Sequence, residues 1–157
     1  MRVLIATDGS TFSRDAIAQS LRFLDLTNMK FRVVSCWEEP EEVAMTTYDM
    51  AIEYYKQADL FARNRAESDV AKAETQIRRT CPDERVKIET KVLSGPPDKT
   101  IVEEARRWRA DMIVVGTHGR GFWGRLLGSI STGIIHHAPC TVFVGRTKEK
   151  PNENGKH

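Results

Sequence analysis

The chain has 157 residues, and its 24 Lys and Arg against 22 Asp and Glu leave a formal net charge of +2. With 40% hydrophobic and 29% charged residues, the composition is typical of one globular domain and excludes a disordered chain. A charge balance this even lacks the strongly basic face with which proteins bind DNA or RNA, which argues against a nucleic-acid partner.

Membrane and secretion signals are missing from the sequence. No run reaches the roughly 18 uncharged apolar residues that a membrane helix needs, and residues 1–10 lack the basic leader and cleavage site of a signal peptide. We therefore expect no membrane partner and a cytoplasmic location. Cys36, Cys81 and Cys140 lie far apart and outside any C-x-x-C spacing, so they indicate structural thiols rather than a disulfide framework or a zinc site.

Short apolar runs alternate along the chain with longer segments of helical periodicity, a pattern typical of an α/β protein with a parallel sheet. The first run, RVLIAT, is almost continuously apolar, as expected of a strand covered on both faces. The third alternates apolar with charged residues, which predicts an edge strand with one wetter face. The five predicted strands are residues 2–7, 31–37, 86–92, 111–116 and 141–144.

Four segments between these strands carry apolar residues at intervals of three or four, as amphipathic helices do. The second is long, because residues 47–80 contain no Pro or Gly. Residues 38–42, four Glu around a Pro, precede it and predict a loop. The other three helices are marked by Ile17, Leu21 and Leu24, by Ile101, Ala105 and Trp108, and by Ile130, Ile134 and His137.

Five strands joined by helical crossovers imply a doubly wound sheet, most simply in the order 3-2-1-4-5 with helices on both faces. The order reverses between the first and fourth strands, and such sheets bind ligands at the carboxyl ends of the strands that flank the reversal. The residues after Thr7 and after Val115 are therefore the candidates for function. We expect the domain to span residues 1–146 and residues 147–157 to form a disordered tail, which has nothing apolar to bury.

An acidic residue, Asp8, follows the first strand in the turn Asp8-Gly9-Ser10. A carboxylate in this place can accept hydrogen bonds from ribose hydroxyls, from adenine or from backbone amides. The alternative is that Asp8 only holds the turn. Ser10, Thr11 and Ser13 are available to cap the helix that follows.

A glycine-rich segment, residues 116–128, follows the fourth strand and has five glycines before the next helix begins. Glycine lets bare backbone amides approach a ligand, and the start of a helix attracts anions through its unpaired N–H groups and its dipole. Phosphate is the natural ligand, assisted by the hydroxyls of Ser129, Ser131 and Thr132. The alternative is a flexible surface loop in which Ser129 or Ser131 caps the helix.

Standard nucleotide motifs do not account for this segment. The pattern GxxxxGK[ST] of P-loop NTPases is absent, and GxGxxG does not follow the first strand. No Ser/His/Asp set with a convincing base, no metal-binding cluster and no Ser-Gly-Gly-x-Asp-Ser loop occurs in the sequence. His136 and His137 are adjacent on a helix, about 100° apart, and cannot readily share a metal. Binding is thus favoured over catalysis.

Several motifs together resemble the universal stress protein family, over nearly the whole chain except the tail. They are Asp-Gly-Ser at 8–10, Gly-Pro-Pro at 95–97, ADMIVVGTHG at 110–119, LLGSIS at 126–131 and HHAPCTVFV at 136–144. The resemblance implies a Rossmann-like fold of the adenine nucleotide alpha hydrolase-like kind. It also implies an ATP-binding stress-response module that binds ATP with Mg²⁺ and forms a homodimer edge to edge through the fifth strand.

The ATP-binding branch of that family carries Gly-x2-Gly-x9-Gly-Ser/Thr, and Gly116, Gly119, Gly128 and Ser129 match its fixed positions. Eight residues rather than nine separate Gly119 from Gly128, a difference of roughly 3.5 Å of extended chain. If the shortening falls at the tip of the loop, the phosphate site is kept. If it shifts Gly128, phosphate binding weakens.

The resemblance also implies roles for individual residues in an adenine-nucleotide site. Ala6, Thr7 and Asp8 would line the adenosine end, Cys36 would lie beside the base, Val115 and Gly116 would line the ribose region, and Gly119, Gly128, Ser129, Ile130 and Ser131 would surround the phosphates. Thr117 and His118 complete the expected site; His118 either touches a phosphate oxygen or faces solvent. Two alternative functions remain: a slow ATPase or adenylating enzyme using the same loop, and a dimeric interaction protein that no longer binds nucleotide.

Overall fold

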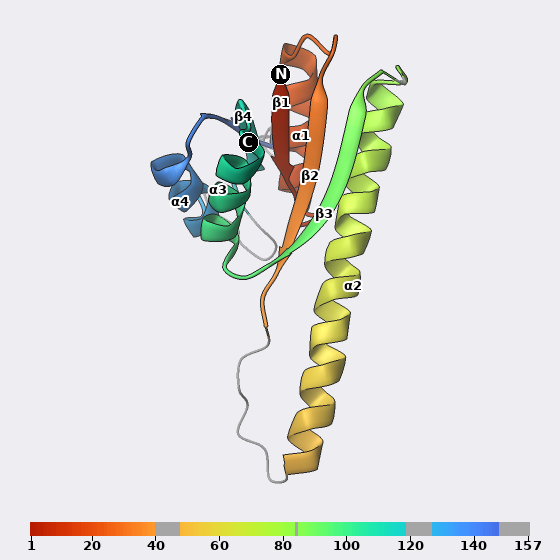
Figure 1. Cartoon of the computed structure of the whole chain (residues 1–157), viewed down its shortest axis with the longest axis vertical. Helices are drawn as coiled ribbons and strands as arrows, with labels where there is room; N and C mark the ends of the chain where they lie inside the picture. The colour runs from red at the N-terminus through yellow and green to blue at the C-terminus, as the bar shows by residue number, and fades with distance from the viewer. Residues whose placement is uncertain (40–47, 84, 119–126, 148–157) are drawn as a thin grey trace, which may run out of the picture.

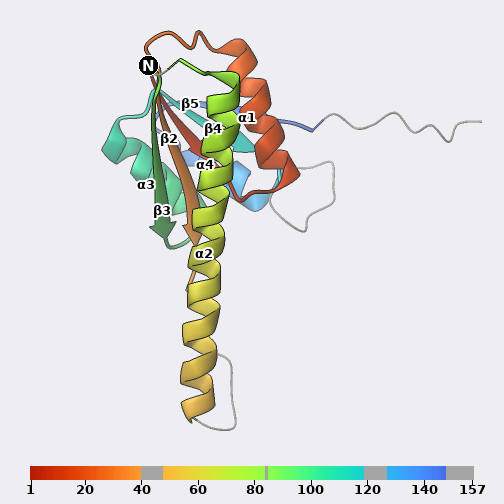
Figure 2. The same ribbon diagram turned by 90° about the vertical axis from the view of Figure 1, so that its right-hand side faces the viewer.

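The computed structural model describes residues 1–39, 48–83, 85–118 and 127–147, and the side chains of residues 48–51 are not described. Five parallel strands form one sheet in the order β3-β2-β1-β4-β5, which confirms the predicted topology. Figure 1 labels β1 to β4, and Figure 2 also labels β5. The strands are β1 (Arg2–Ala6), β2 (Lys30–Trp37), β3 (Lys87–Ser94), β4 (Met112–Gly116) and β5 (Thr141–Gly145). Each lies within about three residues of its predicted position.

Helices cover both faces of the sheet, as expected of a doubly wound fold (Figure 2). They are α1 (Thr11–Phe23), α2 (Tyr48–Thr80), α3 (Pro97–Trp108) and α4 (Ser129–His137). α1 and α2 pack on one face, and α3 and α4 on the other, so the core divides into two clusters. Among the described helices, none is both long and apolar enough to cross a membrane.

β1 lies at the centre of the sheet and contributes side chains to both clusters. Val3 and Ile5 point toward α1 and α2, whereas Leu4 points toward α3 and α4, and all three are fully buried. This explains why the strand reads as a continuous apolar run rather than an alternating one. β3 pairs with β2 and stands at one end of the strand order, so the prediction that it is an edge strand is confirmed.

α2 is much longer than the sheet is deep. Its second half packs on β2 and β3 through Val70, Ala73 and Ile77, whereas its first half extends beyond the carboxyl ends of the strands (Figure 2). Leu60 and Phe61 on this extension are 58% and 68% exposed. The sequence predicted the length of the helix, but only the fold shows that half of it lacks a sheet to cover.

Two glycines at the ends of β4 and β5 allow α1 to approach the sheet closely. A Cβ on Gly116 would lie 2.9 Å from the carbonyl carbon of Phe12, and one on Gly145 would lie 2.2 Å from the Cα of Ala16. No real Cβ contact is so short, so these positions require glycine for packing. From the sequence, Gly116 is expected to let a ligand approach the backbone, and its contact with α1 is a second reason for glycine at this position.

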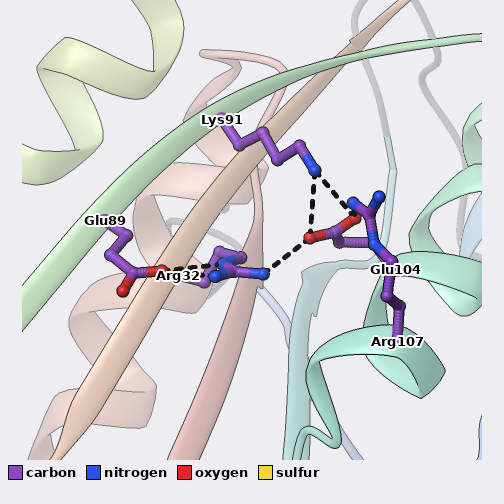
Figure 3. A network of polar contacts seen from close by, with 5 residues as sticks. All are labelled: Arg32, Glu89, Lys91, Glu104 and Arg107. Carbon is purple, nitrogen blue, oxygen red and sulfur yellow. Dashed lines mark hydrogen bonds and ion pairs between the residues drawn. The ribbon is translucent and has the colours of Figure 1, made fainter.

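A cluster of charged residues fastens α3 to β2 and β3 (Figure 3). The carboxylate of Glu104, on α3, is 3% exposed and forms ion pairs with Arg32 at 2.8 Å, with Lys91 at 3.3 Å and with Arg107. Arg32 also donates from Nε to Glu89 at 3.0 Å. Since the partners come from three elements, the cluster fixes the position of α3 along the sheet. We call these five residues the Glu104 cluster.

Candidate functional site

A cavity of about 400 Å³ lies at the carboxyl ends of β1 and β4, where the strand order reverses. This is the place at which doubly wound sheets bind ligands, and the volume lies in the range of small-molecule sites. The described residues that line it are Ala6, Thr7, Asp8, Ser13, Val34, Cys36, Pro97, Ile101, Val115, Gly116, Thr117, His118, Leu127, Gly128, Ser129, Ile130 and Ser131.

Nearly all of the residues singled out from the sequence meet at this cavity. Of the thirteen expected site residues, only Gly119 is missing, because it falls outside the described residues together with the loop that follows it. The effect of the shortened spacing to Gly128 therefore remains a prediction. No Phe, Tyr or Trp occurs among the described lining residues, so none of these three kinds of side chain from that part of the chain fills the cavity.

The turn after β1 forms the acidic side of the cavity. Asp8 accepts a hydrogen bond from the Ser10 amide at 3.0 Å through Oδ1, and Gly9 adopts a left-handed φ of 70°. Ser10 is the N-cap of α1 and accepts from the Ser13 amide at 3.2 Å. Asp8 thus holds its turn and also lines the cavity, and the contact of its carboxylate with a ligand stays a prediction.

The start of α4 forms the opposite side. The N-cap residue, Gly128, has no side chain that could cap the helix, and its amide donates to the Thr117 carbonyl at 2.8 Å. The first N–H groups of a helix have no acceptor within the helix and carry the positive end of its dipole. The backbone of Ser129, Ile130 and Ser131, which lines the cavity, therefore presents a surface suited to an anion.

The Ser131 side chain contributes less to this surface than the sequence analysis expected. Its hydroxyl, 2% exposed as a residue, donates to the carbonyls of Thr117 at 3.0 Å and Gly128 at 2.9 Å. A serine hydroxyl has one proton, so this proton serves to join the end of β4 to α4. Backbone amides, rather than the Ser131 hydroxyl, supply the donors at this end.

An apolar wall connects the two polar sides. It is made by Val34 and Cys36 on β2, by Pro97 and Ile101 on α3, and by Val115. Burial, together with the nearby Glu38 carboxylate, raises the pKa of the Cys36 thiol to about 12. The thiol is therefore neutral at physiological pH, so it adds no charge to this wall.

Five lining residues were not predicted as site residues: Ser13, Val34, Pro97, Ile101 and Leu127. One of them carried a usable signal: Val34 lies two residues before Cys36 on the same strand, so alternation places both on one face. The approach of α1 and α3 to the cavity depends on packing and has no such local signal.

His118 lies inside the site rather than in solvent. It is 9% exposed, and its ring centroid lies 5.2 Å from that of Phe12 on α1. The solvent-facing alternative for this residue is therefore wrong. The histidine packs where β4 leads into the glycine-rich segment, beside the buried Thr117.

A second acidic residue approaches the site from α2. Burial is the main cause that raises the pKa of Asp69, the Asp8 carboxylate raises it further, and Lys72, Arg65 and Arg14 oppose the shift. α2 also contacts the start of α1 directly, because Gln76 Nε2 donates to the Arg14 carbonyl at 2.8 Å. No cluster of three or more His, Cys, Asp or Glu that could hold a metal ion occurs within the described ranges.

Comparison with known sequences identifies relatives of this chain. The model of the universal stress protein family matches residues 1–146. Universal stress protein Sll1388 of Synechocystis is 24% identical over 153 residues, covering 91% of this chain and 96% of the relative. Universal stress protein A homolog 2 of Coxiella burnetii is 44% identical over 57 residues, which cover 36% of this chain and 39% of the relative. The match thus spans less than half of the Coxiella protein.

Solved structures share the fold. The hypothetical protein MJ0577 superposes with a TM-score of 0.76 at 20% identity, covering 95% of this chain and 97% of that one. A universal stress protein in complex with cAMP gives 0.63 at 23% identity, covering 94% and 98%. The Arabidopsis thaliana family member At3g01520, with AMP bound, gives 0.59 at 20% identity, covering 94% and 92%. Such identities support a common fold, and the family model supplies the relationship: the chain belongs to the universal stress protein family.

Proposed function

We propose that this protein binds an adenine nucleotide, ATP with Mg²⁺, in the cavity between β1 and β4. The observation that carries the proposal is the combination of an apolar wall, a carboxylate and an uncapped helix start around one space of about 400 Å³. A nucleotide has the matching sequence of groups: a flat base, a ribose with hydroxyl donors, and an anionic tail. The structural relatives described with cAMP and AMP support the adenine nucleotide class.

The lining suggests how such a ligand would lie. The base would pack against Val34, Cys36 and Ile101, where burial of apolar area provides most of the free energy. The ribose would approach Asp8, which can accept hydrogen bonds from its hydroxyls. The phosphates would meet the amides at the start of α4. Because the described residues contain no ready-made cation cluster, Mg²⁺ would arrive with the phosphates, as it commonly does.

We also propose that the protein acts as a nucleotide-dependent stress-response module in the cytoplasm and as a homodimer. β5 is the edge strand on the side opposite β3, with half-buried Val142, Phe143 and Val144. Phe23 on α1 is 78% exposed, and its ring lies 6.1 Å from that of Phe143. An apolar edge of this kind favours pairing with a second copy. Three free cysteines suit a reducing compartment.

Isothermal titration with ATP and Mg²⁺ tests the binding proposal, together with mass spectrometry of nucleotide retained by the purified protein. Gly128→Val should raise the Kd about tenfold, because a branched side chain beside Thr117 and Ser131 disturbs the amide surface. Gly128→Ala is the matched smaller change: its Cβ would lie 3.3 Å from the Thr117 oxygen, which a small shift relieves, so the Kd should rise by only about two- to threefold. Absence of heat and of a thermal shift at millimolar ATP would refute the proposal. ADP release that scales with protein and disappears in Gly128→Val would indicate the enzymatic alternative.

A further inference from the structure

Ser13 is the polar residue that the structure adds to the site. It is the third residue of α1, is 3% exposed and lines the cavity. Its hydroxyl donates to the Ser10 carbonyl at 3.0 Å. The same oxygen accepts hydrogen bonds from Thr7 Oγ1 at 3.2 Å and from Ser10 Oγ at 3.4 Å.

These three contacts saturate the Ser13 hydroxyl. A serine hydroxyl has one proton to donate and two lone pairs to accept with, and all three are used within the protein. The hydroxyl therefore has no capacity left for a ligand, although it lies at the cavity wall. Its contribution to binding must come through the residues that it holds.

Those residues surround Asp8. Thr7 Oγ1, which donates to Ser13, accepts in turn from the Gly9 amide at 3.1 Å. The hydroxyl pair of Thr7 and Ser13 thus ties the end of β1 and the following turn to the first turn of α1. The turn needs this support, because Gly9 has a left-handed φ of 70° and glycine is the least restrained residue.

We propose that Ser13 is a positioning residue: its buried hydroxyl, linked to Thr7, holds the turn in the shape that presents the Asp8 carboxylate to the nucleoside part of the ligand. The inference rests on the proposed nucleotide binding and deepens it. A carboxylate that is displaced by a fraction of an ångström makes a poorer hydrogen bond, so loss of Ser13 weakens binding through Asp8 and not independently of it.

The test is a double-mutant cycle on the Kd of ATP with Mg²⁺, measured by isothermal titration on wild type, Ser13→Ala, Asp8→Ala and the double variant. Ser13→Ala should raise the Kd about three- to tenfold, as expected for loss of one hydrogen-bonded link. Asp8→Ala should raise it at least as much. The double variant should bind no more weakly than Asp8→Ala alone, because Ser13 has nothing to position once the carboxylate is removed.

Ser20→Ala is the matched control. Ser20 lies on the same helix, is fully buried, and donates its hydroxyl to the Ile17 carbonyl at 2.9 Å, away from the cavity. Its removal should lower the melting temperature while leaving the Kd unchanged. A loss of affinity equal to that of Ser13→Ala would show that any buried hydroxyl of α1 matters, which overturns the proposal.

Thr7→Val and Thr7→Ser provide a second route if Ser13→Ala does not fold. Thr7→Val removes the hydroxyl at nearly the same shape and should raise the Kd, whereas Thr7→Ser keeps the hydroxyl and should bind more tightly than Thr7→Val. A Kd unchanged in Ser13→Ala or Thr7→Val, or effects of Ser13→Ala and Asp8→Ala that multiply, would overturn the inference. Wild type that binds no nucleotide would instead refute the proposed function itself.

Discussion

The Glu104 cluster and the cavity are two polar regions of this protein. They differ in whether their polar groups interact with other residues of the chain or face an open space. Glu104 is buried, yet three cationic side chains of the same chain surround its carboxylate. The cavity has the Asp8 carboxylate on one side and a helix start capped only by Gly128 on the other. The first region completes its interactions internally, whereas the second turns charge and dipole toward a space large enough for a ligand.

The two regions should therefore affect different properties: the Glu104 cluster the stability of the fold, and the cavity the proposed binding of a ligand. A buried charge that loses its partner destabilises the fold, because the remaining charge is poorly solvated. Amides and a carboxylate that line a cavity are hydrated until a ligand replaces the water, so changes there alter affinity first. Variants in the Glu104 cluster should therefore affect unfolding, and variants at the cavity should affect binding.

Glu104→Ala should have the largest effect. Arg32, which is 19% exposed, loses its buried partner, and the side chain leaves a gap under α3, so we expect a loss of about 3 kcal/mol in the free energy of unfolding. Urea denaturation measures the loss, and titration with ATP should give an unchanged Kd for the folded protein. Glu104→Gln, which keeps the shape, should lose less. If Glu104→Ala weakened binding in proportion to the loss of stability, the Glu104 cluster would affect binding too, and the two regions would not differ in this respect.

Gly116→Ala should lower both the stability of the fold and the affinity for the nucleotide. The added Cβ would lie within about 3 Å of three backbone atoms of Phe12 and Ser13, and such overpacking costs about 2 kcal/mol. Since the clash displaces the start of α1, which carries Ser13, affinity should fall as well. Thermal unfolding and titration on the same sample measure both. Full stability would show that α1 can move away from the sheet without cost.

Gly128→Ala should have almost the opposite profile from Glu104→Ala. Gly128 has a φ of −67°, which any residue can adopt, and an added Cβ would lie 3.3 Å from the Thr117 oxygen, with its next contacts at 3.6 Å and 3.8 Å. We expect a change in unfolding free energy below about 0.5 kcal/mol and a rise in Kd of about two- to threefold from partial disturbance of the amides. A large loss of stability with an unchanged Kd would show that Gly128 is needed for the fold rather than for binding.

At neutral pH the smallest effect is expected from the ionisation of Cys36, on the apolar wall. Its folded-state pKa of about 12 lies above the ordinary value of 9.0, mainly because of burial. Below pH 9 the thiol is protonated in the folded and unfolded chain alike, and its contribution to stability is complete. Between pH 9 and about 12 only the unfolded chain releases the proton, so stability should fall. Urea denaturation across this window should give a shallower pH dependence for Cys36→Ala. An equal pH dependence of stability in wild type and Cys36→Ala would indicate that water reaches the thiol and that its pKa is not raised.

Local patterns predicted much of the fold. The continuous run at residues 2–6 reads as a doubly covered strand, and the stretch without Pro or Gly reads as the long α2, because both signals depend only on neighbouring residues. The residues at which the strands begin and end were predicted less accurately. The sequence placed Thr7 in the first strand, whereas the strand ends at Ala6 and the Thr7 hydroxyl begins the turn network instead.

The candidate site was also largely predictable, because its residues follow two strands whose carboxyl ends must meet if the order is 3-2-1-4-5. Asp8 and Gly128 could be named on that ground. Ile101 could not, since its approach depends on how α3 packs across the sheet. The Ser131 hydroxyl was assigned to the ligand, but its geometry directs it to two carbonyls of the chain.

The sequence by itself determined which segments are strands and helices, their order in the sheet and the edge at which the candidate site lies, because hydrophobic periodicity and crossover handedness are local or topological properties. The tertiary structure alone decided that α1 packs against Gly116 and Gly145, that Glu104 meets cations from three elements, and that Ser13 supports Asp8 through Thr7. The first two depend on distances between segments far apart in the chain, which exist only once the layers have packed, and the third depends on how the turn between β1 and α1 folds.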